Sequence, residues 1–158
     1  MMHQQLTKFI QEYYQTNSFI PLHAPHFSGN EKKYLLETIE STFVSSVGKY
    51  VDQLEQQISD YTGVQAIATV NGSAALHTAL YMANVRAKDF VITQALTFVA
   101  TCNVIQMMQA EPIFVDVNKQ SLSLCPVALE SYLQEHAYIC PEGKARDNSS
   151  KKIIRAVD

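Results

Sequence analysis

From about residue 64 onward, the chain alternates short apolar runs with helical patterns, and this alternation constrains the fold more than any other feature. Apolar runs at 66–70, 90–93, 113–117 and 153–157 predict four buried strands. Between them, apolar residues recur three or four positions apart, as they do on one face of a helix. Strand–helix–strand order with right-handed crossovers produces a parallel sheet flanked by helices. The sequence therefore predicts an α/β fold.

Two helices are predicted before the first strand. The segment SGNE (28–31) fits a capping box, in which Ser28 caps the helix and Glu31 bonds back. Gly63 stands where a C-terminal cap of the second helix belongs. The apolar stripes of the two helices are Leu35, Leu36, Ile39 and Phe43, and then Tyr50, Leu54, Ile58 and Tyr61. We expect an N-terminal arm with helices over 1–63, followed by the sheet domain over 64–158.

Three further helices are predicted within the sheet domain. Their apolar positions are Leu76, Ala79, Leu80 and Ala83; then Phe98, Cys102, Ile105 and Met108; then Leu129, Tyr132 and Leu133. Pro126 suits the first turn of the last helix, although Cys125 before it is a poor cap. The polar stretch 141–152 is predicted to be an exposed loop.

Composition and charge exclude several classes of protein. The formal net charge is −3 and the 12 Lys and Arg residues are mostly scattered, which argues against a nucleic-acid partner. No apolar run approaches the roughly 18 residues of a membrane span, and the first residues do not resemble a signal peptide. Cys102, Cys125 and Cys140 lack metal-site spacing and predict reduced thiols. We expect a soluble cytoplasmic protein without a metal site.

The turn Asn71–Gly72–Ser73 lies between a predicted strand and a predicted helix. Glycine lets the backbone turn sharply and lets an anion approach closely. The free N–H groups of a first helical turn attract anions, and Ser73 adds a hydroxyl donor. Many α/β proteins use such a turn for purely structural reasons, so a phosphate site and an ordinary turn are both open. The segment is neither a P-loop nor a G-x-G-x-x-G motif.

A second segment, TQALTFVAT (93–101), follows the next predicted strand and therefore shares the carboxyl edge of the sheet with Ser73. Phe98 could offer its ring face to a planar cofactor, or it could be a core residue.

Four segments occur in an order that resembles the DegT-type family of PLP (pyridoxal phosphate)-dependent nucleotide-sugar aminotransferases. They are GKYVDQLE (48–55), ATVNGSAALH (68–77), VITQALTFVAT (91–101) and PIFVDV (112–117). The segments IPLH (20–23) and VSSVGKYVD (44–52) are most similar to the LegC-like branch, whose members aminate UDP-linked 4-keto sugars for bacterial surface glycans or nonulosonates. The implied fold is the N-terminal part of the fold type I large domain, a mostly parallel sheet flanked by helices, here incomplete.

The resemblance implies roles for individual residues. Gly72, Ser73 and Ala74 match the positions that hold the PLP phosphate, and Phe98 matches the residue that stacks on the pyridine ring. The remaining matches are Asn103, a polar residue near the site, and Gly48 and Tyr50, in the segment lining the sugar-nucleotide site. The implied partners are a UDP-sugar, an amino donor such as glutamate, and a second copy in a homodimer.

The family's catalytic groups have no counterpart in the 158 residues. Its pyridine-pairing aspartate and its Schiff-base lysine belong to motifs expected after Asp158, and no lysine present has a matching context. We therefore expect a truncated chain that is inactive alone. The implied fold also separates strand 66–70 from the other three by strands that come later, so we expect residues 1–158 to fold poorly or aggregate.

Three functions remain open from the sequence. The first is the aminotransferase, in which glutamate supplies the amino group for a 4-keto sugar. The second is a sugar dehydratase of the same fold, with histidine at the lysine position. The third is an inactive fragment or interaction module.

Four other residues invite a functional interpretation that the sequence does not favour. His23 and His26 lack an acidic neighbour and match a structural or substrate-lining segment; His77 fits helix packing and Asp116 fits a turn.

Overall fold

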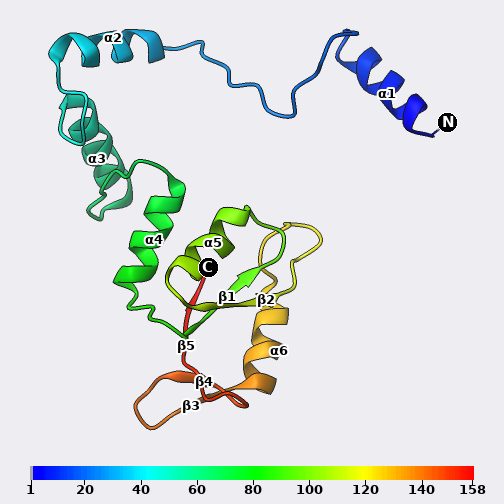
Figure 1. The fold of residues 1–158 in the computed structure, drawn as a ribbon, viewed down its shortest axis with the longest axis vertical. Coiled ribbons are helices and arrows are strands. Elements are labelled where there is room, and N and C mark those ends of the chain that lie inside the picture. The colour runs from blue at the N-terminus through cyan, green and yellow to red at the C-terminus, as the bar shows by residue number, and fades with distance from the viewer. Residues whose placement is uncertain (1) are drawn as a thin grey trace. The chain divides into compact units, whose positions relative to one another are not determined.

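The computed structural model describes residues 2–158 and divides the chain into two compact units, one ending at Leu54 and the other running from Glu55 to Asp158. In chain order the helices are α1 (Met2–Tyr13), α2 (Glu31–Ser41), α3 (Lys49–Thr62), α4 (Gly72–Met82), α5 (Val99–Met107) and α6 (Pro126–His136). The strands are β1 (Phe90–Gln94), β2 (Glu111–Val115), β3 (Ala137–Ile139), β4 (Ala145–Asp147) and β5 (Ile154–Val157) (Figure 1). No helix within 2–158 is long and apolar enough to cross a membrane.

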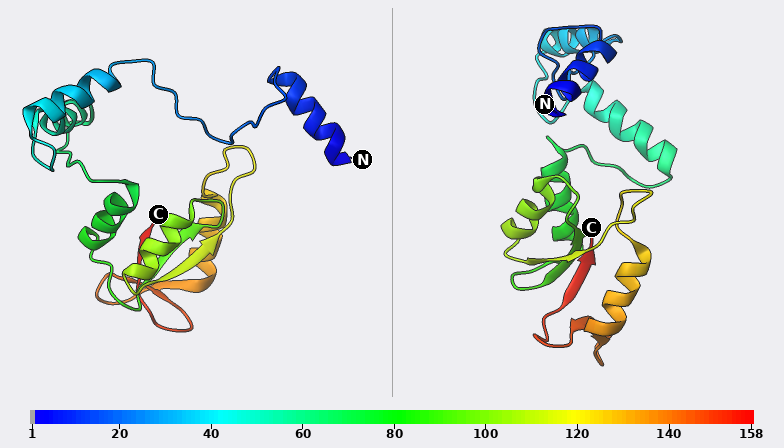
Figure 2. Two further views of the ribbon diagram at one scale, coloured as in Figure 1. Left: turned by 45° about the horizontal axis from the view of Figure 1, so that its top comes forward. Right: turned by 90° about the vertical axis from the view of Figure 1, so that its right-hand side faces the viewer.

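The second unit is an α/β layer structure, as predicted. Its main sheet is parallel with the order β2–β1–β5, so β1 lies in the middle (Figure 2). Central β1 contributes to both faces because successive side chains point to opposite sides. Val91 packs with α4 and α5 on one face, and Ile92 packs with α6 on the other.

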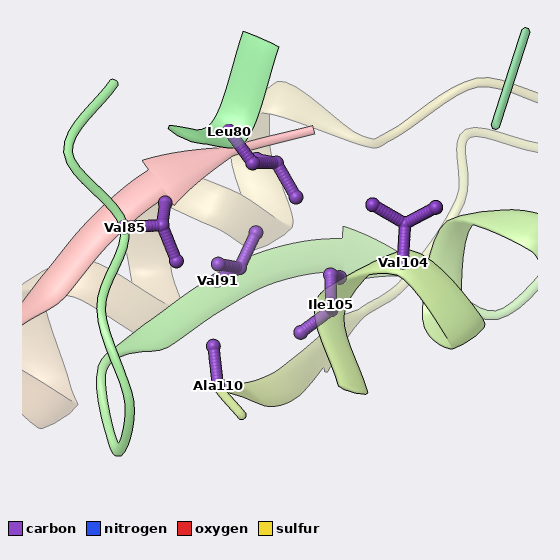
Figure 3. Packing of buried hydrophobic residues seen from close by; sticks show 6 residues of the cluster. All are labelled: Leu80, Val85, Val91, Val104, Ile105 and Ala110. Carbon is purple, nitrogen blue, oxygen red and sulfur yellow. The ribbon is translucent and has the colours of Figure 1, made fainter. Parts of the chain in front are cut away.

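The cluster between the sheet and helices α4 and α5 is the better buried of the two. Figure 3 shows its side chains converging from both helices and from β1. Its members are Leu80, Val85, Val91, Val104, Ile105 and Ala110, all 4% exposed or less. The predicted helical stripes are confirmed in part: Leu80 and Ile105 lie in this core with Leu76 and Met108 packed against it, whereas Ala79, Ala83 and Phe98 are exposed.

Several predicted element boundaries shift. The third strand begins at Glu111 rather than Ile113 and includes Pro112. Proline lacks an N–H, and β2 tolerates it because it is an edge strand of the described sheet. Phe43 lies outside α2, and Phe98 and Met108 flank α5 as its cap residues.

The predicted capping box at 28–31 is wrong in its first half. Asn30, not Ser28, is the residue before α2, and its side chain makes no capping bond. Glu31 does bond back, since its Oε2 accepts from the Gly29 amide at 2.9 Å. Gly63 is confirmed at the end of α3, with φ +75° and its amide 2.8 Å from the Ser59 carbonyl oxygen.

The prediction of a loop throughout 141–152 is also wrong. Residues 145–147 form β4, which pairs antiparallel with β3 directly after α6. Asp147 is buried at the end of this hairpin and accepts three hydrogen bonds from Ser149 and Ser150. These bonds hold the turn that leads to β5, a function that polar composition alone does not reveal.

The predicted strand 66–70 is not a strand of the described sheet. The segment has no partner strand within residues 2–158, and Ile67 and Val70 are 77% and 89% exposed. Backbone pairing makes a strand, so an extended segment without a partner remains outside the sheet.

Candidate functional site

The first candidate site lies where α4 begins. Asn71 caps the helix: its side-chain oxygen accepts from the Ala74 amide at 2.9 Å, and its carbonyl accepts from the Ala75 amide at 3.0 Å. The amides of Gly72 and Ser73 have no hydrogen-bond partner among residues 2–158. Two donors therefore remain at the positive end of an 11-residue helix.

The surroundings of these two amides fit a phosphate group. Both residues are exposed, and a Cβ placed on Gly72 would meet nothing within 4 Å. The first turn of α4 contains no acidic side chain that would repel an anion. The Ser73 hydroxyl adds a third donor. Ala74 differs from these two because its amide is already bonded to Asn71.

Phe98 lies at the start of α5, directly before its first turn. Its ring is 84% exposed, and its backbone is extended, with φ −63° and ψ 139°. Helices α4 and α5 pack side by side through Leu80, Val104 and Ile105, and both begin at the end toward which β1 runs (Figure 1). The structure thus brings Ser73 and Phe98 to the same edge of the second unit. A large exposed aromatic ring there is available to cover a planar ligand.

Three other predicted residues of this unit take ordinary positions. Asn103 is exposed on α5, and His77 is half-buried on α4. Asp116 follows β2; its side chain accepts from the Val117 amide at 2.8 Å and its carbonyl accepts from the Cys125 amide, as in a structural turn. Ala95, Leu96 and Phe114 line a hollow with Asp116 beside the Phe98 segment.

The second candidate site is a pocket in the first unit, between α2 and the start of α3. It has a volume of about 260 Å³ and includes both Gly48 and Tyr50 in its lining. Gly48 has a structural reason to be glycine, since a Cβ there would lie 3.3 Å from the Phe43 carbonyl oxygen. The other lining residues are Glu37, Thr38, Ser41, Phe43, Ser45, Lys49 and Val51.

Glu37 organises this pocket and was missed by sequence reasoning. Its Oε2 accepts a short hydrogen bond from the Tyr50 hydroxyl. Lys33 and Lys49 approach the same carboxylate at 3.9 and 4.0 Å, and Tyr34 packs on the Tyr50 ring with centroids 4.7 Å apart. The hydrogen bond to Glu37 raises the pKa of Tyr50 to about 12. The two residues are 13 positions apart in sequence, so the pairing leaves no local signal.

No metal centre is present in the described residues. No group of three His, Cys, Asp or Glu side chains gathers anywhere in 2–158. His23 and His26 are both exposed in the segment between α1 and α2.

Comparison with known proteins finds relatives of one kind by sequence model and by pairwise similarity. Residues 25–141 match the sequence model of the DegT/DnrJ/EryC1/StrS aminotransferase family. The chain is 39% identical over 117 residues to the putative pyridoxal phosphate-dependent aminotransferase EpsN of Bacillus subtilis, covering 73% of this chain and 30% of EpsN. It is 38% identical over 127 residues to the GDP-perosamine synthase of Caulobacter vibrioides, covering 80% of this chain and 33% of that enzyme. The chain thus spans about a third of the length of these relatives.

Solved structures show the same fold. The putative sugar aminotransferase Spr1654 of Streptococcus pneumoniae in its PMP form, where PMP is pyridoxamine phosphate, superposes with a TM-score of 0.63 at 28% identity. The match covers 72% of this chain and 29% of that structure. An aminotransferase from Psychrobacter cryohalolentis gives the same TM-score, identity and coverage.

Proposed function

The chain belongs to the DegT/DnrJ/EryC1/StrS aminotransferase family, and we propose that it forms the phosphate-binding part of a PLP-dependent enzyme that aminates a nucleotide-linked sugar. The substrate we propose is a UDP-linked 4-keto-6-deoxy sugar, with glutamate as amino donor. The LegC-like motifs support this choice, and the sugar-related names of two relatives, GDP-perosamine synthase and spore coat polysaccharide biosynthesis protein SpsC, support a sugar substrate.

The observation that carries the proposal is the donor set at the start of α4. We assign the free amides of Gly72 and Ser73, with the Ser73 hydroxyl, to the cofactor phosphate. We assign the exposed ring of Phe98 to the face of the cofactor ring and Asn103 to the surroundings of the site. When bound, PLP supplies an electron sink for exchange of an amino group. These residues bind and orient that group.

The Ala74 amide has a more restricted role in this scheme. Asn71 already accepts its hydrogen. The Ala74 amide can therefore bond to the phosphate only if it shares its hydrogen with Asn71 or breaks the capping bond. The amides of Gly72 and Ser73 can bond to the phosphate without such a rearrangement.

We assign recognition of the sugar nucleotide to the pocket that contains Gly48 and Tyr50. Its lining combines the aromatic side chains of Phe43 and Tyr50 with hydroxyl groups, the Glu37 carboxylate and the amino group of Lys49, so apolar surface for a ring lies beside groups that can bond to sugar hydroxyls. The arm and helices over 1–63 are proposed to serve the substrate, and the sheet domain over 64–158 the cofactor. We further propose a cytoplasmic homodimer.

Covalent chemistry is assigned to the whole protein and not to these residues. No lysine in 1–158 stands in a segment that resembles the family's lysine motif. We therefore expect the 158-residue chain to bind the phosphate form of the cofactor weakly and to transfer no amino group by itself.

Binding of PMP tests the cofactor assignment, because this amine form needs no lysine. Fluorescence titration of the 158-residue chain should show binding of PMP and none of pyridoxamine, which lacks the phosphate. Ser73→Ala should weaken PMP binding about tenfold, since it removes one hydrogen bond to a charged group. Thr78→Ala, which removes an exposed hydroxyl farther along α4, is the matched control. Equal binding of PMP and pyridoxamine would contradict the assignment.

The substrate assignment is tested on the full-length protein with PLP and glutamate. We expect an amino sugar from the UDP-linked 4-keto-6-deoxy substrate and less from the GDP-linked one. The reverse preference would place the protein with the perosamine synthases. A product that has lost a hydroxyl and gained no nitrogen would favour the dehydratase, and no product with either would favour a non-catalytic role.

A further inference from the structure

Two side chains of α3 hold the segment that leads into the α4 turn. Glu55 Oε1 accepts from the Ala68 amide at 2.8 Å, and Ser59 Oγ accepts from the Ala66 amide at 2.9 Å. All four residues belong to the second unit and are half-buried. Side chains thus satisfy the amides that a neighbouring strand would satisfy in a sheet.

The spacing of the two acceptors matches the spacing of the two donors. Residues four apart on a helix are separated by about 6 Å along its axis, at 1.5 Å per residue. Amides two apart on an extended chain point to the same side and are about 6.7 Å apart. The first acceptor in sequence pairs with the second donor, so the segment runs antiparallel to α3. Two bonds in this register fix both the position and the direction of the segment.

The opposite edge of the segment is free. The amides of Ile67 and Thr69 point away from α3 and have no partner among residues 2–158. Within the described residues, the hydrogen bonds to Glu55 and Ser59 are therefore the ones that hold the backbone amides of segment 66–70 in place just before the turn.

This attachment lies directly before the candidate phosphate site. Ala68 is three residues ahead of Asn71, whose side chain and carbonyl cap α4. The intervening Thr69 hydroxyl bonds to the Asn71 carbonyl at 3.1 Å, which ties the end of the segment to the cap. A shift of the segment along α3 would therefore move the cap and the amides of Gly72 and Ser73 with it.

We propose that Glu55 and Ser59 are positioning residues for the phosphate site: they anchor segment 66–70 to α3 and so preset the Gly72 and Ser73 amides for an anion. This inference rests on the proposed role of those amides in cofactor binding. Neither side chain touches the ligand in this scheme. Their contribution is to reduce the motion that binding would otherwise have to stop.

The test combines amide hydrogen exchange measured by NMR with PMP affinity in the same 158-residue chain. Glu55→Ala should speed exchange at Ala68 at least tenfold and weaken PMP binding about fivefold. Glu55→Gln should restore both values, because the amide oxygen still accepts the hydrogen bond. Asp60→Ala is the matched control: among residues 2–158 its carboxylate accepts only from Gln56 on the same helix, so both values should stay at wild type.

Further measurements separate positioning from loss of fold. Exchange at Val104 and Ile105, in the core, should be unchanged in every variant. Ser59→Ala, a smaller change than Glu55→Ala, should speed amide exchange at Ala66 and should also weaken PMP binding. Unchanged PMP affinity in Glu55→Ala and Ser59→Ala, with wild type still binding PMP, overturns the positioning role alone. Absence of PMP binding in wild type overturns the phosphate assignment and this inference with it.

Discussion

Asp89 and Arg155 form an ion pair that joins the start of β1 to β5 across 66 positions of sequence, with Arg155 Nε 3.1 Å from Asp89 Oδ2. Their side chains are 9% and 18% exposed. Asp89 Oδ2 also accepts from the Arg86 amide at 3.0 Å, so one carboxylate fixes both the turn before β1 and the last strand.

Removing the carboxylate should destabilise the second unit strongly. Asp89→Ala leaves the Arg155 guanidinium largely buried without its partner, which costs about 3 kcal/mol of unfolding free energy. Urea denaturation followed by circular dichroism measures the change. Glu142→Ala, which breaks the more exposed pair with Arg146, is the control and should cost less than about 1 kcal/mol. Equal losses in the two variants would refute a structural role for Asp89.

Asp147 should make stability depend on acid pH. Hydrogen bonds from Ser150 and Ser149 lower the pKa of its carboxyl to about 2, from the ordinary 3.8. A lowered folded-state pKa stabilises the protein above the unfolded value, and this contribution disappears as pH falls from about 4 to 2. Asp147→Asn should lose roughly 2 kcal/mol at neutral pH, because bonds to a charged group are lost, and much less at pH 2. Denaturation at both pH values, with Asp60→Asn as control, measures this; a loss independent of pH would contradict it.

Tyr50 should titrate at unusually high pH. Its hydrogen bond to Glu37 raises its pKa to about 12, so the contribution to stability is present below pH 10 and is lost between about pH 10 and 12. The difference in tyrosinate absorbance between wild type and Tyr50→Phe isolates this residue from the other tyrosines. Glu37→Gln should return the midpoint toward 10, since the amide carries no charge. Tyr61→Phe, at an exposed position on the same helix, is the control and should leave the Tyr50 midpoint unchanged. A Tyr50 midpoint unaffected by Glu37→Gln would disprove the pairing.

Segment 66–70 should govern association of the 158-residue chain. Ile67 is 77% exposed beside an unpaired backbone edge, a combination that promotes strand pairing between molecules. Ile67→Lys should raise the monomer fraction measured by light scattering, because the charge opposes edge-to-edge pairing. Leu22→Lys is the control, since Leu22 is 95% exposed but lies outside any strand-like segment. An equal gain from both variants would point to general surface hydrophobicity instead.

Local patterns were sufficient wherever a residue's environment depends on its near neighbours in sequence. The apolar run at β1 predicted a buried strand correctly, and the apolar periodicity around Leu80 and Ile105 predicted two helices and their most buried residues, because side-chain periodicity reports which face is buried. Gly63 likewise predicted the end of α3 correctly, because the residue that ends a helix often needs a positive φ and glycine adopts it readily. The Asn71–Gly72–Ser73 turn was also predicted locally, because an apolar run there is followed directly by a helical pattern, and α4 does begin at Gly72.

Short and polar elements were the ones that local patterns misrepresented. The hairpin that ends at Asp147 has strands of three residues, too short to show an alternating pattern, and its polar composition is that of a loop. Its order depends on hydrogen bonds to one buried carboxylate, which only the folded chain brings together.

The sequence by itself determined the α/β class of this protein, the position of its candidate phosphate turn and its family motifs, all of which are written in contiguous residues. The tertiary structure alone decided that residues 66–70 bond to Glu55 and Ser59 instead of to a strand, that Glu37 binds Tyr50, and that Asp89 meets Arg155. A hydrogen bond or ion pair forms where two groups come within about 3 Å. That distance is set by how the helices and strands pack, and no single stretch of sequence encodes it.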